Sequence, residues 1–197
     1  LETSDTGRKI AGFPVDTLEE IWKALVLGVQ DYVNKNGFPG VLLGLSGGVD
    51  LALTLAVAQA ALGSDRVHAV MMPFRYTSQM SIEDAALQAQ WLNVHYSVIP
   101  IEDIYESFTQ ALADEFLGYK PDSTEENIQA RARGVLLMSL SNKTGKLVLT
   151  TGNKSEIAVG YSTLYGDMAG GFNVLKDVPK TLVFALCHYR NSLQQSI

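Results

Sequence analysis

The sequence is poor in cysteine, in long apolar runs and in positive charge, and each shortage excludes a class of protein. Cys187 is the only cysteine, so the chain can form no internal disulfide and has no Cys-x-x-Cys pair for zinc or thiol chemistry. No apolar run reaches the ~18 residues that a bilayer-spanning helix needs, and residues 1–10 contain no signal-peptide core. A formal net charge of −6 disfavours nonspecific binding to nucleic acid and to membrane surfaces. These shortages favour a cytoplasmic enzyme.

The composition indicates one domain. The chain has 197 residues, 47% of them hydrophobic, which is enough for a single sizeable core. It starts without methionine and stops abruptly at Ile197, so we expect a piece of a longer protein. We interpret residues 1–197 as one domain in which residues 1–16 are a linker.

Apolar periodicity predicts helices that alternate with short strands. Residues 17–36 carry apolar side chains at helical spacing, with a capping box of Thr17 and Glu20 and a stop at Gly37. The run Val41–Leu45 has no polar alternation, which indicates a strand buried on both faces. Strands are also predicted at 67–72, 94–99 and 147–151, and helices at 50–62, 81–93, 102–116, 125–141, 154–159 and from Pro179. This order predicts an α/β fold of three layers, a parallel sheet with helices on both faces.

The glycine-rich turn GLSGGVD at residues 44–50 is the first segment that points to chemistry. It follows a strand and opens a helix, where glycine amides and free helix N–H groups favour a phosphate. It lacks the lysine of a Walker loop and the GxGxxG dinucleotide pattern. A carboxylate beside a phosphate needs a bridging cation, which makes Asp50 a candidate magnesium ligand. Alternatively, Asp50 only caps its helix and the glycines only form a tight turn.

The turn resembles the SGGxDS loop of the PP-loop ATP pyrophosphatases, which include NAD, GMP, asparagine and argininosuccinate synthetases. The resemblance implies cleavage of ATP between the α and β phosphates and transfer of AMP to an oxygen that a nitrogen nucleophile then displaces. The pattern departs at Leu51, which stands where the family has a serine whose hydroxyl reaches the phosphates. Losing such a charge-assisted hydrogen bond costs on the order of 1.5–3 kcal/mol, and Thr54 is a doubtful substitute. A nucleotide-binding but catalytically impaired protein is therefore one alternative.

Four later segments restrict the resemblance to one member of the PP-loop ATP pyrophosphatases. They are ENIQARAR at 126–133, TGNKSE at 151–156, GYSTLYGD at 160–167 and NVLKDVPKT at 173–181. In this order they closely resemble NAD synthetases, above all the synthetase domain of the glutamine-dependent form, over residues 18–191. Another PP-loop amidotransferase or a tRNA-modifying relative is a second alternative. The single cysteine and the acidic charge argue against the tRNA-modifying relatives.

The resemblance implies a set of site residues. ATP would be bound by Gly44, Leu45, Ser46, Gly47, Gly48, Val49, Asp50, Leu51, Arg75, Thr151 and Lys180. Magnesium would be bound by Asp50 and Glu156, and deamido-NAD by Asn127, Arg131, Glu156 and Asp167. The catalytic residues would be Asp50, Glu156 and Lys180.

The residues alone leave other interpretations open. Glu156 equally suits a charge at a helix N-terminus, and Lys180 equally suits a solvated helix lysine. Arg131 and Arg133 are two positions apart on a helix and face different directions, so only one of them reaches a given ligand.

The implied reaction is the ATP-dependent amidation of deamido-NAD to NAD through an acyl-adenylate, with release of AMP and pyrophosphate. Ammonia is the nitrogen donor, supplied free or from glutamine by a separate N-terminal amidase domain. The resemblance also implies a homodimer. Cys187 and the three histidines stand in no nucleophile–base arrangement, so we expect no covalent enzyme intermediate.

Overall fold

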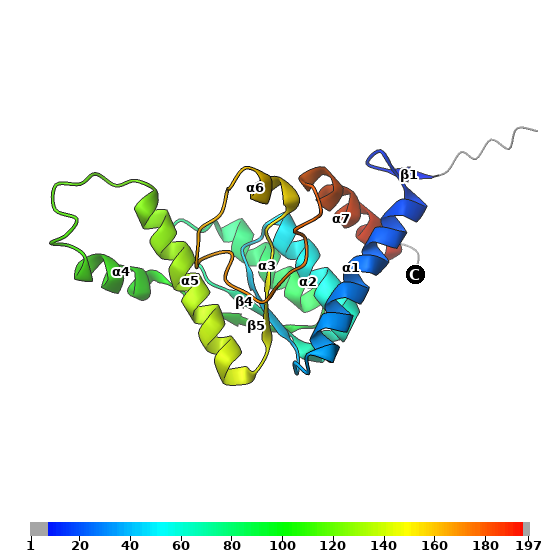
Figure 1. Cartoon of the computed structure of the whole chain (residues 1–197), viewed down its shortest axis with the longest axis horizontal. Coiled ribbons are helices and arrows are strands. Elements are labelled where there is room, and N and C mark those ends of the chain that lie inside the picture. Colours follow the sequence, from blue (N-terminus) through cyan, green and yellow to red (C-terminus); the bar gives the residue numbers. More distant parts are fainter. Residues whose placement is uncertain (1–7, 195–197) are drawn as a thin grey trace, which may run out of the picture.

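The computed structural model describes residues 8–194, and its centre is a parallel sheet (Figure 1). Among these residues the sheet has five strands in the order β5-β4-β3-β6-β7, each parallel to its neighbours. Their bounds are β3 Val41–Leu45, β4 Val67–Met71, β5 His95–Val98, β6 Leu147–Thr150 and β7 Phe172–Asn173. The predicted α/β fold with a parallel sheet is confirmed.

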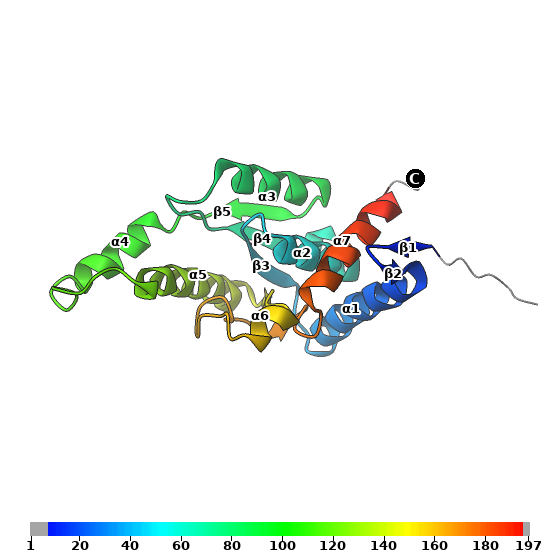
Figure 2. The same cartoon turned by 90° about the horizontal axis from the view of Figure 1, so that it is seen from above.

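Helices cover both faces of this sheet. One face carries α1 (Val15–Lys35), α2 (Val49–Leu62), α3 (Gln79–Trp91) and α7 (Lys180–Gln194). The other carries α5 (Ser123–Thr144), against which α4 (Glu102–Ala111) packs. In Figure 2, α4 and α5 lie to the left of the strands, and α1, α2 and α7 lie to the right. None of the helices within residues 8–194 has both the length and the apolarity needed to cross a bilayer.

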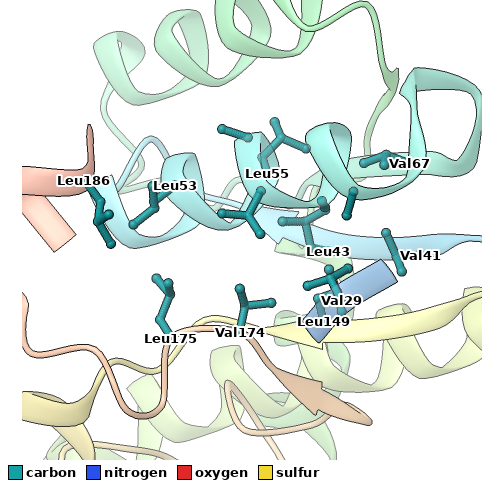
Figure 3. Close-up of a cluster of buried hydrophobic side chains, with 14 of the residues drawn as sticks. Val29, Val41, Leu43, Leu53, Leu55, Val67, Leu149, Val174, Leu175 and Leu186 are labelled. Carbon is teal, nitrogen blue, oxygen red and sulfur yellow. The ribbon is translucent and has the colours of Figure 1, made fainter. Parts of the chain in front are cut away.

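Side-chain alternation along the strands divides the core in two. Val41, Leu43 and Leu45 of β3 belong to the larger cluster, which Figure 3 shows packed between the sheet and α1, α2 and α7. Val70 of β4 belongs to a smaller cluster that packs against α5. All five residues of β4 are buried, as expected for a strand covered on both faces.

The strand order reverses between β3 and β6. The chain leaves β3 towards β4 and β5 and returns through α5 to β6 on the other side of β3. In open parallel sheets, ligands bind outside the carboxyl ends of the strands at such a reversal. β3 ends at Leu45 and β6 ends at Thr150, so the residues that follow them lie at this point.

The start of α1 differs from the prediction. The helix begins at Val15 after Pro14, with no side-chain cap, so the capping box predicted for Thr17 and Glu20 is wrong. Residues 9–14, part of the predicted linker, form a hairpin of β1 (Lys9–Ile10) and β2 (Phe13–Pro14). Residues 1–7 of that linker lie outside the described residues. The predicted stop is confirmed, because Gly37 adopts a φ of 72°.

Several further boundaries differ from the prediction, and two of them have clear local reasons. α4 ends at Ala111 rather than at residue 116, because the chain continues in turns although apolar residues recur. α5 begins at Ser123, because Asp122 and Glu125 form a capping box in front of it. The short strand β7 was not predicted, since two residues carry no periodicity.

Candidate active site

A cavity of about 340 Å³ lies at the reversal point, between the ends of β3 and β6 and the side of α5. This volume is in the range of small-molecule sites. Six of the residues predicted from the sequence line it, namely Gly44, Leu45, Ser46, Leu51, Thr151 and Asp167. The fold therefore joins the glycine turn to segments more than one hundred positions later in the chain.

The glycine turn leaves the start of α2 open. Gly47 has a φ of 74°, and a Cβ there would lie 2.9 Å from the backbone oxygen of Ser81, so the position requires glycine. Gly48 is the N-cap residue of α2 and supplies no side-chain cap. Asp50 lies inside the first turn, which excludes the interpretation that it caps the helix. The first N–H groups of α2 thus keep the arrangement that binds anions.

Beside the turn, Asp50 is the centre of a polar cluster. Its Oδ2 forms an ion pair with Nζ of Lys180 at the start of α7. Its Oδ1 accepts a hydrogen bond of 2.9 Å from Nδ2 of Asn153. The Asp50 side chain is 14% exposed, and Asn153 is completely buried. The structure thus brings together Asp50 and Lys180, both of which were predicted as site residues, and it adds Asn153, for which no role was predicted.

Glu156 reaches the same cluster through Asn153. The Glu156 N–H donates to Asn153 Oδ1 at 3.0 Å, and the Asn153 N–H donates to Glu156 Oε2 at 3.2 Å, which makes a capping box for α6 (Lys154–Ala158). Residues 8–194 hold no group of three or more Asp, Glu, His or Cys side chains that would by itself bind a metal ion. Mg²⁺ is commonly held by one or two carboxylates together with substrate phosphates, and Asp50 fits that pattern. The role of Glu156 as a second ligand stays a prediction.

Of the residues predicted to contact deamido-NAD, Asn127, Arg131 and Asp167 lie where α5 meets the loop of residues 159–171, whereas Glu156 lies on α6. Thr163 joins two of them: its Oγ1 donates to Asn127 Oδ1 and its N–H donates to Asp167 Oδ1, each at 2.9 Å. Arg131 donates from Nε to the Leu164 carbonyl at 3.2 Å. Of the four predicted residues only Asp167 lines the cavity, so this loop forms one of its walls.

The arginine that lines the cavity is Arg133, not Arg131. Arg133 is half-buried, donates from Nε to the Met72 carbonyl at 3.1 Å, and has a pKa lowered by burial. As expected from their spacing, the two arginines face different directions. The spacing along the helix could have identified Arg133, because Ala130 and Leu137 lie on the same face of α5 and also line the cavity.

Arg75 lies outside the cavity lining. Its guanidinium forms ion pairs with Glu102 and Glu106 of α4 and lies 5.1 Å from the centre of the Phe74 ring. The hydrogen bond and charge of Glu102, followed by those of Glu106, raise the pKa of Arg75. From the same segment, Thr77 lines the cavity. Contact between Arg75 and ATP stays a prediction.

Cys187 on α7 lies close enough to the polar cluster for the charges of Asp50 and Lys180 to affect its pKa. Burial raises the pKa of the Cys187 thiol to about 11, Asp50 adds to this rise, and Lys180 opposes it. The thiol therefore stays protonated at neutral pH and offers no thiolate nucleophile.

Several known proteins similar to this chain are NAD synthetases. A sequence model of the NAD synthase family matches residues 21–197. The glutamine-dependent NAD(+) synthetase of Acinetobacter baylyi is 59% identical over 182 residues, which make up 92% of this chain and 34% of that protein. The chain thus spans about a third of the length of the curated relatives it matches.

Two solved structures extend the similarity to the fold. The glutamine-dependent NAD+ synthetase of Acinetobacter baumannii in complex with ADP has a TM-score of 0.89 and 62% identity, covering 90% of this chain and 34% of that one. The NH3-dependent NAD synthetase of Campylobacter jejuni in complex with nitrate has a TM-score of 0.81 and 33% identity, covering 88% and 73%. With the cavity at the strand reversal and the sequence match over residues 21–197, they show that the chain belongs to the NAD synthase family.

Proposed function

We propose that this chain is the synthetase part of an NAD synthetase, which uses ATP to convert deamido-NAD to NAD. The observation that carries the proposal is the cavity at the strand reversal, where the open start of α2 adjoins the Asp50–Lys180 pair. The A. baumannii relative was solved with ADP, which supports a nucleotide as the ligand here.

The parts of the site suggest how ATP is held. The first N–H groups of α2 and the Ser46 hydroxyl would bind its phosphates. Lys180 would add a positive charge beside them, and Asp50 would hold Mg²⁺, with Glu156 as the second carboxylate. When bound, Mg²⁺ supplies a Lewis acid and orients the phosphates. Thr151 and Ser46 face the cavity that would take the rest of the nucleotide.

The first chemical step forms the acyl-adenylate. A carboxylate oxygen of the nicotinate ring attacks the α-phosphorus, and the bond from that phosphorus to the oxygen shared with the β-phosphorus breaks. Pyrophosphate leaves with the negative charge, which Lys180 stabilises. Asn127, Arg131 and Asp167 hold the deamido-NAD in place, so that the two reacting atoms meet.

The second step replaces AMP with nitrogen. Ammonia attacks the acyl carbon and gives up a proton, and the bond between that carbon and the AMP oxygen breaks, which releases NAD and AMP. A protonated Cys187 takes no part, so catalysis rests on positioning and on charge stabilisation.

The proposal extends to the protein from which this chain comes. Because the relatives from Acinetobacter baylyi and Rhodobacter capsulatus are glutamine-dependent, we propose that a separate glutaminase domain supplies the ammonia. We further propose that the synthetase parts form a homodimer. A cytoplasmic location stays a prediction from the sequence.

Pyrophosphate exchange tests the first step directly. Labelled pyrophosphate is expected to enter ATP when the chain, Mg²⁺ and deamido-NAD are all present. NAD in place of deamido-NAD is the matched control, because its amide lacks the attacking carboxylate. Exchange that proceeds without deamido-NAD would count against the assignment.

Leu51 favours a second candidate function, nucleotide binding without turnover. Leu51 lines the cavity. It stands at the position where the SGGxDS loop of the family has a serine hydroxyl. Calorimetric binding of ATP with no release of AMP, even with deamido-NAD and ammonia present, would support this candidate over the synthetase.

A further inference from the structure

Asn153 is completely buried and uses both ends of its side-chain amide. Oδ1 accepts the Glu156 N–H at 3.0 Å and so caps α6. Nδ2 donates to Oδ1 of Asp50 at 2.9 Å, although the two residues are 103 positions apart. The side chain thus links the end of β6 to the first turn of α2.

Capping alone does not explain an asparagine at this position. An N-cap residue needs only an oxygen that accepts an N–H, and serine, threonine or aspartate serve as well. Asp122 shows this in the same chain, since it caps α5 with the same kind of capping box. Asparagine differs by carrying its donors on a nitrogen separate from the acceptor oxygen, so that it can cap a helix and donate to a second group at once. Here that nitrogen is directed at Asp50.

Because Asn153 bonds to only one oxygen of Asp50, the two carboxylate oxygens have different partners. Oδ1 is held by the amide, whereas Oδ2 is the oxygen that pairs with Lys180. Of these two groups, the lysine has the more mobile side chain and is 37% exposed. Oδ2 is therefore the oxygen that a cation arriving with a nucleotide would meet, and the Asn153 amide would restrain rotation of the carboxylate.

We propose that Asn153 is a positioning residue, which fixes the Asp50 carboxylate so that Oδ2 faces the divalent cation bound with the nucleotide. The inference rests on the proposed function, because that function supplies the cation. Groups that orient a metal ligand by hydrogen bonding commonly change affinity or activity by about 10- to 100-fold when they are removed.

Calorimetry with ADP tests this through binding rather than turnover. In Asn153→Ser the hydroxyl still caps α6 but no amide reaches Asp50, so we expect the gain in ADP affinity caused by Mg²⁺ to fall about tenfold. Affinity without Mg²⁺ is expected to stay within about twofold. Asp122→Ser is the matched control, because it makes the same kind of replacement in the capping box of α5 and should leave both affinities unchanged.

A double-mutant cycle with Asp50→Ala separates positioning from capping. If Asn153 acts through Asp50, Asn153→Ser has no further effect on the Mg²⁺-dependent gain once the carboxylate is gone. An equal effect in both backgrounds would overturn the proposal. So would an unchanged Mg²⁺-dependent gain in the single variant, provided that thermal unfolding shows it to be folded.

If the Asn153 variants fail to fold, NMR can test the hydrogen bond between Asn153 and Asp50 without replacing Asn153. The NMR resonances of the Asn153 side-chain amide protons should differ between the wild-type chain and the Asp50→Ala variant, which keeps Asn153. Unchanged resonances would show that the amide does not bond to Asp50 and would overturn the proposal. If the wild-type chain bound no ADP, the proposed function would fail instead, and the amide resonance would still decide whether Asn153 holds Asp50.

Discussion

Asp50 on α2 and Lys180 on α7 form an ion pair although 130 positions separate them in the chain. The pair exists because α7 packs against α2 on one face of the sheet and begins next to α6. The Lys180 N–H donates to Ser155 Oγ at 3.1 Å, which fixes the start of α7 beside the end of β6. A lysine placed in this way offsets the negative charge of the Asp50 carboxylate.

Replacing Lys180 with alanine should reduce catalysis much more than stability. We expect pyrophosphate exchange to fall about 100-fold, because one preorganised positive charge at the leaving group is lost. The free energy of unfolding should drop by about 1–2 kcal/mol, since Asp50 loses its partner in a partly exposed pair. Lys176→Ala is the control, because that exposed lysine pairs loosely with Asp177 at 3.8 Å. Equal losses of exchange in both variants would contradict a specific role for Lys180.

Leu51→Ser should restore a missing donor. A hydroxyl that reaches the phosphates is expected to raise ATP affinity or exchange about tenfold. The same change should lower the free energy of unfolding by about 1–2 kcal/mol, because Leu51 is partly buried against the larger core cluster. Leu51→Ala loses the packing without adding the hydroxyl, so comparing it with Leu51→Ser separates the effect of the lost packing from that of the added hydroxyl. If serine and alanine behave alike in exchange assays, the leucine does not limit the reaction.

The sheet and the glycine turn could be predicted because their signals are local. Val41–Leu45 is a continuous apolar run followed at once by glycines, a pattern typical of a buried strand with a ligand-binding turn. The hairpin before α1 could not be predicted in this way, because two-residue strands have no periodicity and Ala11 adopts an unusual positive φ of 47°.

The candidate site was predictable only in part. A glycine turn ending in Asp50 indicates a phosphate and a cation by its chemistry. The family resemblance implied only that Lys180 belongs to the same site, and its ion pair with Asp50 was not predicted. Asn153 was missed because an asparagine before a helix looks like an ordinary cap, and its bond to Asp50 depends on tertiary packing. Arg131 was chosen over Arg133 because the family resemblance implied it, although the helical spacing of Ala130, Arg133 and Leu137 places these three residues on one face of α5.

Gly134→Ala should damage the wall of the cavity. A Cβ at Gly134 would lie 2.9 Å from the Tyr165 carbonyl oxygen and 3.0 Å from that of Gly166, so the loop of residues 159–171 would have to move. We expect a loss of about 1–3 kcal/mol in the free energy of unfolding and weaker ADP binding by calorimetry. Gly28→Ala is the control: its nearest contact would be Phe172 at 3.9 Å, and alanine should stabilise α1 by about 0.5–1 kcal/mol. Unchanged ADP affinity in a folded Gly134→Ala variant would argue against this loop as a wall of the nucleotide site.

His68 predicts how stability depends on pH. Burial, followed by the charges of His95 and Lys146, lowers the pKa of His68 from 6.5 to about 4. The imidazole is 7% exposed, lies 4.0 Å centre to centre from that of His95, and has its Nε2 2.8 Å from Ser97 Oγ. The folded chain therefore favours the neutral ring, and the unfolded chain takes up a proton first as the pH falls.

Stability should then decrease between pH 6.5 and about pH 4 as the unfolded state becomes protonated at this residue. The full shift corresponds to roughly 3 kcal/mol in the free energy of unfolding. His68→Gln, whose amide can still bond to Ser97, should remove this part of the acid sensitivity, as measured by denaturant unfolding at several pH values. His95→Gln should reduce it by less, because it removes the secondary cause and leaves the burial of His68. Parallel pH profiles for wild type and His68→Gln would show that the histidine is not held neutral in the folded chain.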